Sequence, residues 1–362
     1  IGNKATRWRL VRYDTTAGSH RKRGCLAAPA MAASPRATLL ASPIPGVTLK
    51  SAKLNGITVR YAEAGDAAHP LVIFCHGWPE SWYSWRHQLT SVAAAGFYGV
   101  APDMRGYGGT DAPHDPAQYD HFKHLSGDVL ALVEHVGHST ATLVGHDWGG
   151  AVVWNLAAMR PDKFPRVCAM SVPRSLGAFT VSGLKKRFNW KEGADRADDF
   201  FYMLYHNEID PKTGNLVAAQ DYSRNPQKFF ASIMGTSGDS KWQEEHTIPP
   251  KVNPMAPRAE GGFMDRMRTL KNPAVLAPWF SSADLEYYVT EFTAHGFAGG
   301  LNYYRCMDHT TASGRPYDQK PITQPALFIG GVRDMVTVMS GGQERIEKAM
   351  SKMVPNCEIH WL

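Results

Sequence analysis

One aspartate in this sequence lies where a nucleophile would be exposed at the end of a buried strand. Residues 143–150 read LVGHDWGG, so that Asp147 follows a short apolar run and stands between Gly145 and Gly149. Small residues two positions before and two after allow the sharp turn of a nucleophile elbow, which presents its central side chain at the edge of a sheet. The helix expected next adds backbone N–H donors and the positive end of its dipole. The pattern predicts a nucleophilic Asp147, and the alternative is an aspartate that caps a helix.

A second segment supplies what an attack by this carboxylate would need next. Residues 74–89 read FCHGWPESWYSWRHQL. A His-Gly-Trp-Pro turn after an apolar run is of the kind that points a backbone N–H at a developing oxyanion. We therefore expect the backbone N–H groups of Trp78 and Trp148 to form a two-donor oxyanion hole. The nucleophile itself needs no base, because an ordinary aspartate is already ionised at neutral pH.

Alternating strands and helices would position these two segments. Continuous apolar runs predict strands, and apolar residues at helical spacing predict helices. The predicted strands lie within residues 47–65 (a hairpin turning at Asn55-Gly56), 69–77, 97–111, 140–147, 166–173, 324–334 and 357–362. The predicted helices lie at residues 121–137, 149–161 and 341–353. This alternation is typical of an α/β fold with a doubly wound, mostly parallel sheet.

The strand pattern breaks in the middle of the chain, and this break sets the expected division into parts. Residues 174–315 are rich in aromatic residues, proline and polar residues and contain no clear buried strand, so we expect an inserted helical lid. The core would consist of residues 46–173 together with residues 316–362, and residues 1–45 form a basic leader.

The leader carries most of the net charge. The whole chain has a formal net charge of +6, whereas residues 1–45 hold eight Lys or Arg and a single acid. The remaining residues are therefore close to neutral, so no basic nucleic-acid face is implied and we expect no nucleic-acid partner. The leader is rich in Arg, Ala and Ser, as organellar transit peptides are. We expect a plastid or mitochondrial location if the leader is a transit peptide, and a cytoplasmic location otherwise.

The rest of the composition argues against several other classes of protein. Five scattered cysteines without a CxxC pair predict neither a disulfide framework nor a zinc site. No apolar run reaches the roughly 18 residues of a membrane span, so we expect no stable membrane insertion. We expect no metal and no cofactor, and the oligomeric state stays open.

Four segments in combination resemble the epoxide hydrolase branch of the α/β-hydrolase family. They read HGWPESWYSW, APDMRGYGGTD, GHDWGG and GFAGGLNYYR, and the resemblance spans roughly residues 46–362. It implies the α/β-hydrolase fold with a helical lid, and hydrolysis of a small apolar epoxide by water to a vicinal diol. In that chemistry the carboxylate forms a covalent ester with an epoxide carbon, and water then cleaves the ester.

The resemblance also implies roles for individual residues. The implied catalytic residues are a nucleophile, an acid that orients a histidine base, and two lid tyrosines that donate hydrogen bonds to the epoxide oxygen: Asp147, Asp334, Tyr202 and Tyr304. The implied substrate-binding residues are two tryptophans and the same two tyrosines: Trp78, Trp148, Tyr202 and Tyr304. Two neighbouring tyrosines, Tyr205 and Tyr303, are near enough in sequence to exchange roles with the two donors.

The resemblance places the histidine base in a loop after the last strand, and there the sequence departs from the pattern. The chain ends at EIHWL, inside the strand-like stretch, so that His360 is not assigned as the base. We expect a fragment whose fold is truncated at its C-terminal end. Such a chain can form the ester, because Asp147 needs no base, and would stall there.

Two other functions stay open at this stage. A haloalkane or haloacid dehalogenase would use the same aspartate as its nucleophile, with Trp148 as a donor to the halide. A non-catalytic protein that binds small apolar molecules is the alternative from a different class. It is supported only by the missing base.

Overall fold

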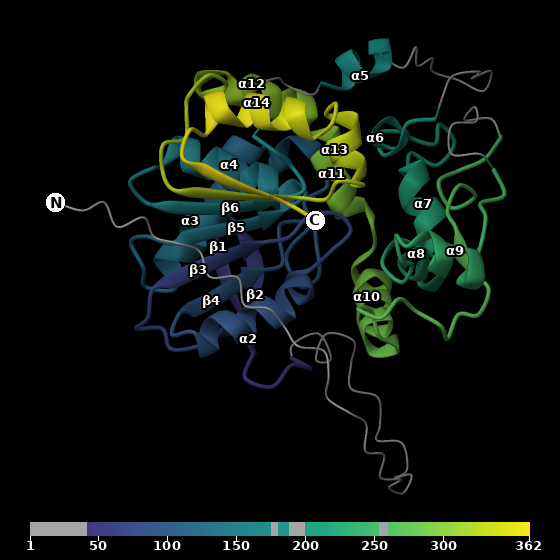
Figure 1. Cartoon of the computed structure of the whole chain (residues 1–362), viewed down its shortest axis with the longest axis horizontal. Coiled ribbons are helices and arrows are strands. Elements are labelled where there is room, and N and C mark those ends of the chain that lie inside the picture. Colours follow the sequence, from purple (N-terminus) through teal and green to yellow (C-terminus); the bar gives the residue numbers. More distant parts are fainter. Residues whose placement is uncertain (1–41, 175–179, 188–199, 253–259) are drawn as a thin grey trace, which may run out of the picture. The chain divides into compact units, whose positions relative to one another are not determined.

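The computed structural model describes residues 42–174, 180–187, 200–252 and 260–362, and nearly all of the predicted leader lies outside these residues. Within them, eight strands form one sheet in the order β1-β2-β4-β3-β5-β6-β9-β10 (Figure 1). The strands are β1 (Thr48–Leu54), β2 (Ile57–Ala64), β3 (Leu71–Cys75), β4 (Tyr98–Pro102), β5 (Thr142–His146), β6 (Arg166–Met170), β9 (Ala326–Gly330) and β10 (Cys357–Trp361).

The sheet is antiparallel at one edge and parallel across the rest. β1 and β2 form the predicted hairpin, which turns at Asn55 and Gly56, both with positive φ. β2 pairs antiparallel with β4, whereas the six strands from β4 to β10 in the sheet order pair parallel with one another. Every residue of β3 and β4 is buried, as expected for strands covered on both faces. The predicted doubly wound, mostly parallel sheet is confirmed.

Helices cover the sheet, and α4 is the helix that positions the predicted nucleophile. α4 packs against β5 and β6, and α2 packs against β4. The helical elements of the core are α2 (Arg86–Ala94), α3 (Ser126–His135), α4 (Trp148–Met159), α13 (Met335–Met339) and α14 (Gln343–Met353), with the short turns η1 (Trp82–Trp85) and η2 (Pro116–Tyr119). No helix in the described part of the chain is long and apolar enough to cross a membrane.

The helix predicted over residues 121–137 differs from the expectation at its start. It begins with a π-helical turn, η3 (His121–Leu125), before α3 continues it. The Asp120 side chain caps this turn by accepting the backbone N–H groups of Phe122 and Lys123. The spacing of apolar residues predicted one regular helix, because this spacing carries no information about a local change in the hydrogen-bond pattern.

The strand order decides where a site can form. β3 lies between β4 and β5, so the chain moves to one side of β3 with β4 and to the other side with β5. Such a change of direction leaves a crevice at the carboxyl ends of the strands, where ligands bind in open α/β sheets. The turn after β3 carries Trp78, and the turn after β5 carries Asp147. The topology therefore brings the two predicted segments to adjacent strand ends.

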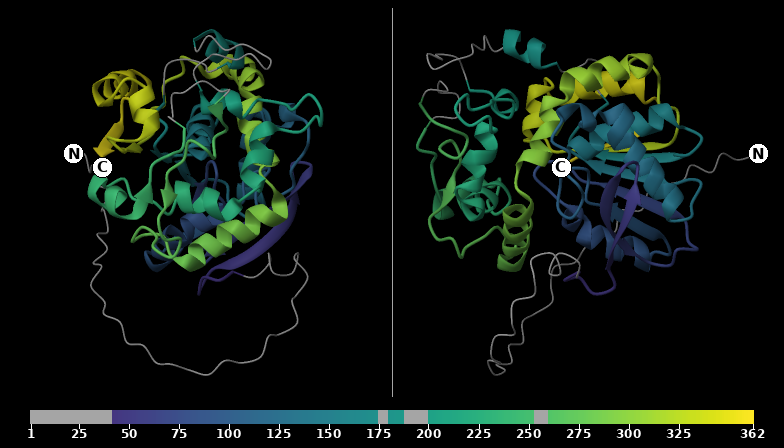
Figure 2. Two further views of the ribbon diagram at one scale, coloured as in Figure 1. Left: turned by 90° about the vertical axis from the view of Figure 1, so that its right-hand side faces the viewer. Right: turned by 180° about the vertical axis from the view of Figure 1, so that it is seen from behind.

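The segment between β6 and β9 is mainly helical where it is described, and we call it the lid. Figure 2 shows α6 to α10, coloured teal to green, gathered beside the sheet. The helical elements of the whole lid are α5 (Val181–Arg187), α6 (Tyr202–Tyr205), α7 (Val217–Ser223), α8 (Pro226–Ile233), α9 (Ser240–His246), α10 (Ser282–His295), α11 (Ala298–Arg305), α12 (Met307–Gly314) and η5 (Arg315–Tyr317). A short strand pair, β7 (Thr247–Ile248) with β8 (Thr269–Leu270), adds to the lid and was not predicted.

Two glycines allow the lid to meet the core backbone to backbone. A Cβ atom on Gly299 in α11 would lie 2.3 Å from the carbonyl oxygen of Gly106. A Cβ atom on Gly106 would lie 2.8 Å from the carbonyl carbon of Gly299, and Gly106 has a φ of 86° that residues with side chains rarely adopt. The glycine-rich motifs of core and lid are thus close neighbours in space.

Candidate active site

Asp147 occupies a strained turn between β5 and α4. Its φ is 51° and its ψ is −123°, a conformation that is rare for a residue other than glycine. A Cβ atom on Gly145 would lie 2.4 Å from the carbonyl oxygen of Gly149, and one on Gly149 would lie 2.1 Å from the carbonyl oxygen of Cys75. Both glycines are therefore required by close packing, and the turn has the form expected of a nucleophile elbow.

The Asp147 carboxylate does not cap α4. Its side chain makes no cap hydrogen bond to that helix. Oδ1 instead accepts the backbone N–H of Trp78 at 2.8 Å, across the gap between the ends of β3 and β5. A Cβ atom on Gly77 would lie 2.4 Å from the Asp147 side chain, so glycine is needed at this point of the turn. The carboxylate thus accepts a hydrogen bond from one of the two N–H groups that the sequence predicts as oxyanion-hole donors.

The turn that presents the Trp78 N–H is held by two side chains. His76 is buried; its Nε2 accepts the backbone N–H of Met104 at 2.9 Å, and its Nδ1 lies 2.9 Å from the carbonyl oxygen of Gly77. Burial lowers the pKa of His76, so its ring is neutral and can accept at one nitrogen while it donates at the other. Glu80 accepts the backbone N–H of Gly77 at 2.8 Å. The direction of the Trp78 N–H is therefore fixed before any substrate binds.

Burial makes Asp147 a weaker acid than an ordinary aspartate. It raises the pKa of Asp147 to about 6, against the opposing effects of the charge on His146 and the backbone N–H groups of Trp78 and Trp148. At pH 7 the carboxylate is still mostly ionised. The loss of hydration leaves it less stabilised than in water, which favours attack on carbon.

Glu80 and His146 form an ion pair beside the carboxylate. Nδ1 of His146 lies 3.1 Å from Oε1 of Glu80. Burial opposes charge on the imidazole, but the Glu80 carboxylate prevails and raises the pKa of His146 to about 9. His146 is consequently a cation at neutral pH. The sequence analysis predicts no role for Glu80, although it lies within HGWPESW; its place three residues after Gly77 was the available signal.

Tyr202 and Tyr304 come together beside Asp147 from different parts of the lid. Tyr202 begins α6 and Tyr304 lies in α11, and their ring centroids are 6.0 Å apart. The Tyr304 ring lies 5.1 Å from that of Trp148. Burial and then the charge of Asp147 raise the pKa of both phenols well above its usual range. Both tyrosines are therefore protonated and able to donate hydrogen bonds.

The two alternative tyrosines point their hydroxyls elsewhere. The hydroxyl of Tyr205 donates to Asp221 at 2.8 Å. The hydroxyl of Tyr303 donates to the backbone carbonyl of Arg105 at 3.0 Å. Both side chains are buried, so these hydrogen bonds account for their polar ends. The hydroxyl partners therefore distinguish Tyr205 from Tyr202 and Tyr303 from Tyr304, a choice that the sequence left open.

Asp334 lies just after β9, and His360 lies in β10, the last strand. Asp334 follows β9 and begins α13, where its side chain accepts the backbone N–H of Val336 at 2.8 Å. Its charge acts on His146 and on the phenol of Tyr202, which shows that it is near the site. His360 is in β10, and its Nε2 lies 2.6 Å from the carboxylate of Glu358 on the same strand.

Known proteins are similar to this chain in both sequence and fold. A family model described as alpha/beta hydrolase fold matches residues 70–254. Epoxide hydrolase A of Mycobacterium tuberculosis is 35% identical over 85% of this chain and 90% of its own length. Epoxide hydrolase of Caballeronia sordidicola is 36% identical over 77% of this chain and 76% of its own. The crystal structure of epoxide hydrolase A from Mycobacterium thermoresistibile has a TM-score of 0.72 and 32% identity, and the match covers 87% of this chain and 91% of that chain.

The chain belongs to the epoxide hydrolase branch of the α/β-hydrolase family. The predicted α/β-hydrolase fold and the predicted enzyme class are confirmed by this membership. The relatives favour an epoxide hydrolase over the dehalogenase and over the non-catalytic binder.

Aromatic side chains form much of the surroundings of the site in this epoxide hydrolase. The Trp78 ring lies within about 6.5 Å, centroid to centroid, of six rings of the lid: His206, Tyr222, Phe229, Phe292, Phe297 and Tyr304. His206 was not predicted; burial lowers its pKa to about 3, and its ring lies 4.4 Å from that of Tyr304. In the described residues, no three His, Cys, Asp or Glu side chains are grouped to hold a metal ion.

Proposed function

We propose that this chain hydrolyses small apolar epoxides to vicinal diols through a covalent ester on Asp147. The observation that carries the proposal is the 2.8 Å hydrogen bond from the backbone N–H of Trp78 to Oδ1 of Asp147. It holds one carboxylate oxygen in the oxyanion hole and leaves the other available for attack. The aromatic side chains around Trp78 favour an apolar substrate.

The first half-reaction needs the carboxylate and the two lid tyrosines. The second oxygen of Asp147 attacks an epoxide carbon, so that a new O–C bond forms and a C–O bond of the ring breaks. The electron pair of the broken bond moves to the epoxide oxygen, which receives hydrogen bonds from Tyr202 and Tyr304 and a proton from one of them. Solvent water later returns that proton to the tyrosine. The raised pKa of both phenols supports this role, because they enter the reaction protonated.

The second half-reaction uses the oxyanion hole. The oxygen bound to Trp78 becomes the carbonyl oxygen of the ester, so it is already in position when water attacks the carbonyl carbon. The backbone N–H groups of Trp78 and Trp148 then stabilise the tetrahedral oxyanion. A histidine oriented by Asp334 would take the proton from the attacking water. Collapse of the tetrahedral intermediate breaks its bond to the alkoxide oxygen, which takes the proton held by the histidine and leaves as the diol. The carboxylic acid formed on Asp147 then releases its proton to solvent, which restores the carboxylate.

The two histidines nearest to these groups in the sequence are poorly suited to act as that base. His146 is protonated at neutral pH because Glu80 raises its pKa to about 9. Both ring nitrogens of His76 are engaged in the Trp78 turn. We therefore expect residues 1–362 by themselves to hydrolyse the ester more slowly than they form it, so that the ester accumulates.

Ester formation is the direct test. The wild-type chain is incubated with styrene oxide, the reaction is quenched in acid, and the intact mass of the protein is measured. We expect a mass increase equal to one epoxide, which peptide fragmentation maps to Asp147. Diol in the solution is quantified in the same samples.

Two carboxylate variants make the test specific. Asp147→Asn should form no adduct, because an amide is a poor nucleophile at neutral pH. Asp334→Asn removes the other predicted carboxylate and should still form the ester, because the orienting acid acts only in the second half-reaction. A folded wild-type chain that yields neither adduct nor diol would refute the proposal. Diol formation without a detectable adduct would support the overall reaction but refute accumulation of the ester.

A further inference from the structure

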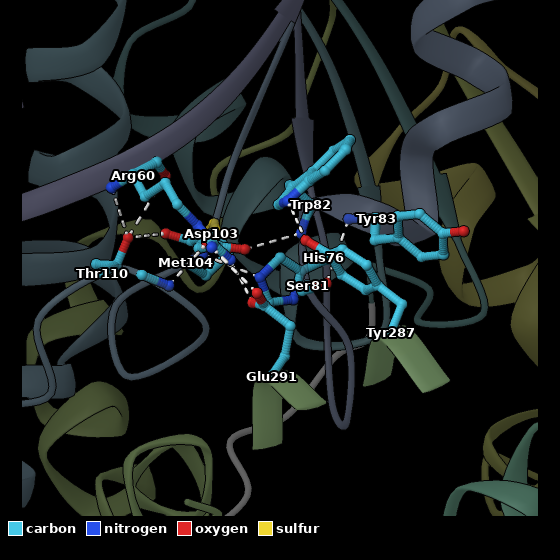
Figure 3. Close-up of polar contacts among 11 residues, drawn as sticks. Arg60, His76, Ser81, Trp82, Tyr83, Asp103, Met104, Thr110, Tyr287 and Glu291 are labelled. Atoms are coloured by element: carbon cyan, nitrogen blue, oxygen red, sulfur yellow. Dashed lines mark hydrogen bonds and ion pairs between the residues drawn. The ribbon is translucent and has the colours of Figure 1, made fainter. Parts of the chain in front are cut away.

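A buried ion cluster joins the lid to the core (Figure 3). Its members are Arg60 in β2, Asp103 directly after β4, and Glu291 in α10. Their side chains are at most 3% exposed. The Arg60 guanidinium contacts Asp103 through Nε, and it contacts Glu291 through Nη1 at 3.1 Å and through Nη2. One guanidinium therefore bridges a core carboxylate and a lid carboxylate.

On the core side, Asp103 lies close to the turn that forms the oxyanion hole. It accepts the backbone N–H groups of Trp82 at 3.1 Å and Gly109 at 3.0 Å. The next residue, Met104, donates its backbone N–H to His76, which in turn contacts the Trp78 turn. Figure 3 shows Asp103, Met104 and His76 side by side. The cluster is thus anchored to the segment that presents the Trp78 N–H.

On the lid side, Glu291 lies one turn before the end of α10. This helix ends at His295, and α11, which carries Tyr304, begins at Ala298. Tyr287, one turn before Glu291, accepts the indole N–H of Trp82 at 2.8 Å. Glu291 thus forms a lid–core polar contact of α10 close to α11, and His295 at the end of the helix adds contacts with the backbone of Gly106 and Gly108. A shift of α10 at this point would be passed to Tyr304 through a short connection.

The ion pair between Arg60 and Glu291 matters energetically because both of its charges are buried. A carboxylate loses its hydration when it is buried, so it stays ionised only where an opposite charge replaces the water. Removal of the Glu291 charge deletes the ion pair between Arg60 and α10, so the buried contact of this helix with the core loses its charged component at this point. Burial and then the charge of Asp103 raise the pKa of Glu291 to about 7, against the opposing effect of Arg60. The tests are therefore run at pH 8, where Glu291 is mostly ionised.

We propose that Glu291 is a positioning residue for ring opening: its ion pair with Arg60 fixes the end of α10 and thereby places the Tyr304 hydroxyl opposite Asp147. This inference rests on the proposed function, since it concerns the step in which Tyr304 receives the epoxide oxygen. Glu291 touches neither the substrate nor the reacting atoms. Its effect is on alignment, and alignment errors of about 1 Å can cost about 100-fold in rate.

The test compares two lid carboxylates on the same helix. Glu291→Gln neutralises the partner of Arg60 and keeps the shape of the side chain. Asp284→Asn is the matched control, because Asp284 also pairs with a core arginine, Arg86, at 3.0 Å, but two turns farther from α11. The rate of ester formation is measured by intact mass over a range of epoxide concentrations, and thermal unfolding is followed for each variant.

We expect Glu291→Gln to lower the saturating rate of ester formation by about tenfold or more, with less than a roughly threefold change in the half-saturating epoxide concentration. Asp284→Asn should lose stability with little change in that rate. Glu291→Asp keeps the charge on a shorter side chain and should lie between Glu291→Gln and the wild type. It also carries the test if Glu291→Gln does not fold.

The outcomes separate this inference from the proposed function. An adduct on the wild-type chain at an unchanged rate in Glu291→Gln would overturn the positioning role alone. Equal rate losses in Glu291→Gln and Asp284→Asn would also overturn it, because both would then reflect general loosening of the lid. Neither adduct nor diol from the folded wild-type chain would overturn the proposed function, and the positioning role with it.

Discussion

The raised pKa of Asp147 leads to a sharp prediction about the pH dependence of ester formation. Only the ionised carboxylate attacks, so the rate should follow the ionised fraction. With a pKa of about 6, that fraction is roughly 90% at pH 7 and roughly 10% at pH 5. An aspartate with the ordinary pKa would remain more than about 90% ionised at pH 5. We therefore expect a roughly tenfold fall in rate between pH 7 and pH 5, where an unperturbed nucleophile would show almost none.

The same shift has a consequence for stability, with a definite sign. The folded chain binds the Asp147 proton more tightly than the unfolded chain, so the free energy of unfolding falls as the pH rises from about 4 to about 6. The shift of the Asp147 pKa from its ordinary value to about 6 corresponds to at most about 3 kcal/mol of unfolding free energy. The actual effect is smaller, because the side chain is only partly shielded from water. Asp147→Asn removes this cost, and asparagine tolerates positive φ. We expect the variant to melt at a higher temperature than the wild type at pH 7.

The assay is single-turnover ester formation, measured by quenched intact mass from pH 5 to pH 8 at saturating epoxide, with loss of epoxide in buffer subtracted. Because Glu291 titrates in the same range, the profile is repeated with Glu291→Gln, whose midpoint should stay near 6. A rate at pH 5 that exceeds half the rate at pH 7 would refute the argument. So would an Asp147→Asn variant that is clearly less stable than the wild type at pH 7.

Three further predictions follow from individual contacts. His146→Gln removes the cation that most lowers the Asp147 pKa, so the midpoint of the same pH profile should move upward; a downward shift would contradict the electrostatic account. Tyr304→Phe should slow ester formation by about 100-fold. Tyr303→Phe removes a hydroxyl that donates to a backbone carbonyl, so it should cost about 1 kcal/mol of stability and leave the rate of ester formation unchanged. Gly77→Ala should abolish ester formation, because its Cβ would lie 2.4 Å from the Asp147 side chain; circular dichroism checks that the variant is folded, and an active variant would show that the turn can yield.

Much of the fold could be predicted because its signals are local. Strands buried on both faces require continuous apolar runs, and the alternation of such runs with helices predicts a parallel sheet. The elbow was equally visible, since Gly145 and Gly149 stand two residues from Asp147 and the close approach they permit is a property of that turn. The π-helical start of α3 was missed, because apolar spacing does not report the hydrogen-bond pattern at a helix end.

The roles of the site residues stay predictions, although tertiary structure narrows them. The sequence could not separate Tyr202 from Tyr205 or Tyr304 from Tyr303, because neighbours in a helix differ only in the direction that packing gives them. The structure separates them by hydroxyl partners, since Tyr205 and Tyr303 are engaged elsewhere.

The sequence by itself determined the family, the sheet and the glycine-bounded turn at Asp147, because these depend on residues close together in the chain. Tertiary structure alone decided the environment of that turn. The Trp78 N–H reaches Asp147 over 69 positions, and Arg60 meets Glu291 over 231 positions. The pKa of Asp147 depends on how many water molecules the folded chain excludes. Contacts between distant residues and the loss of hydration arise only when the chain packs, so no local pattern records them.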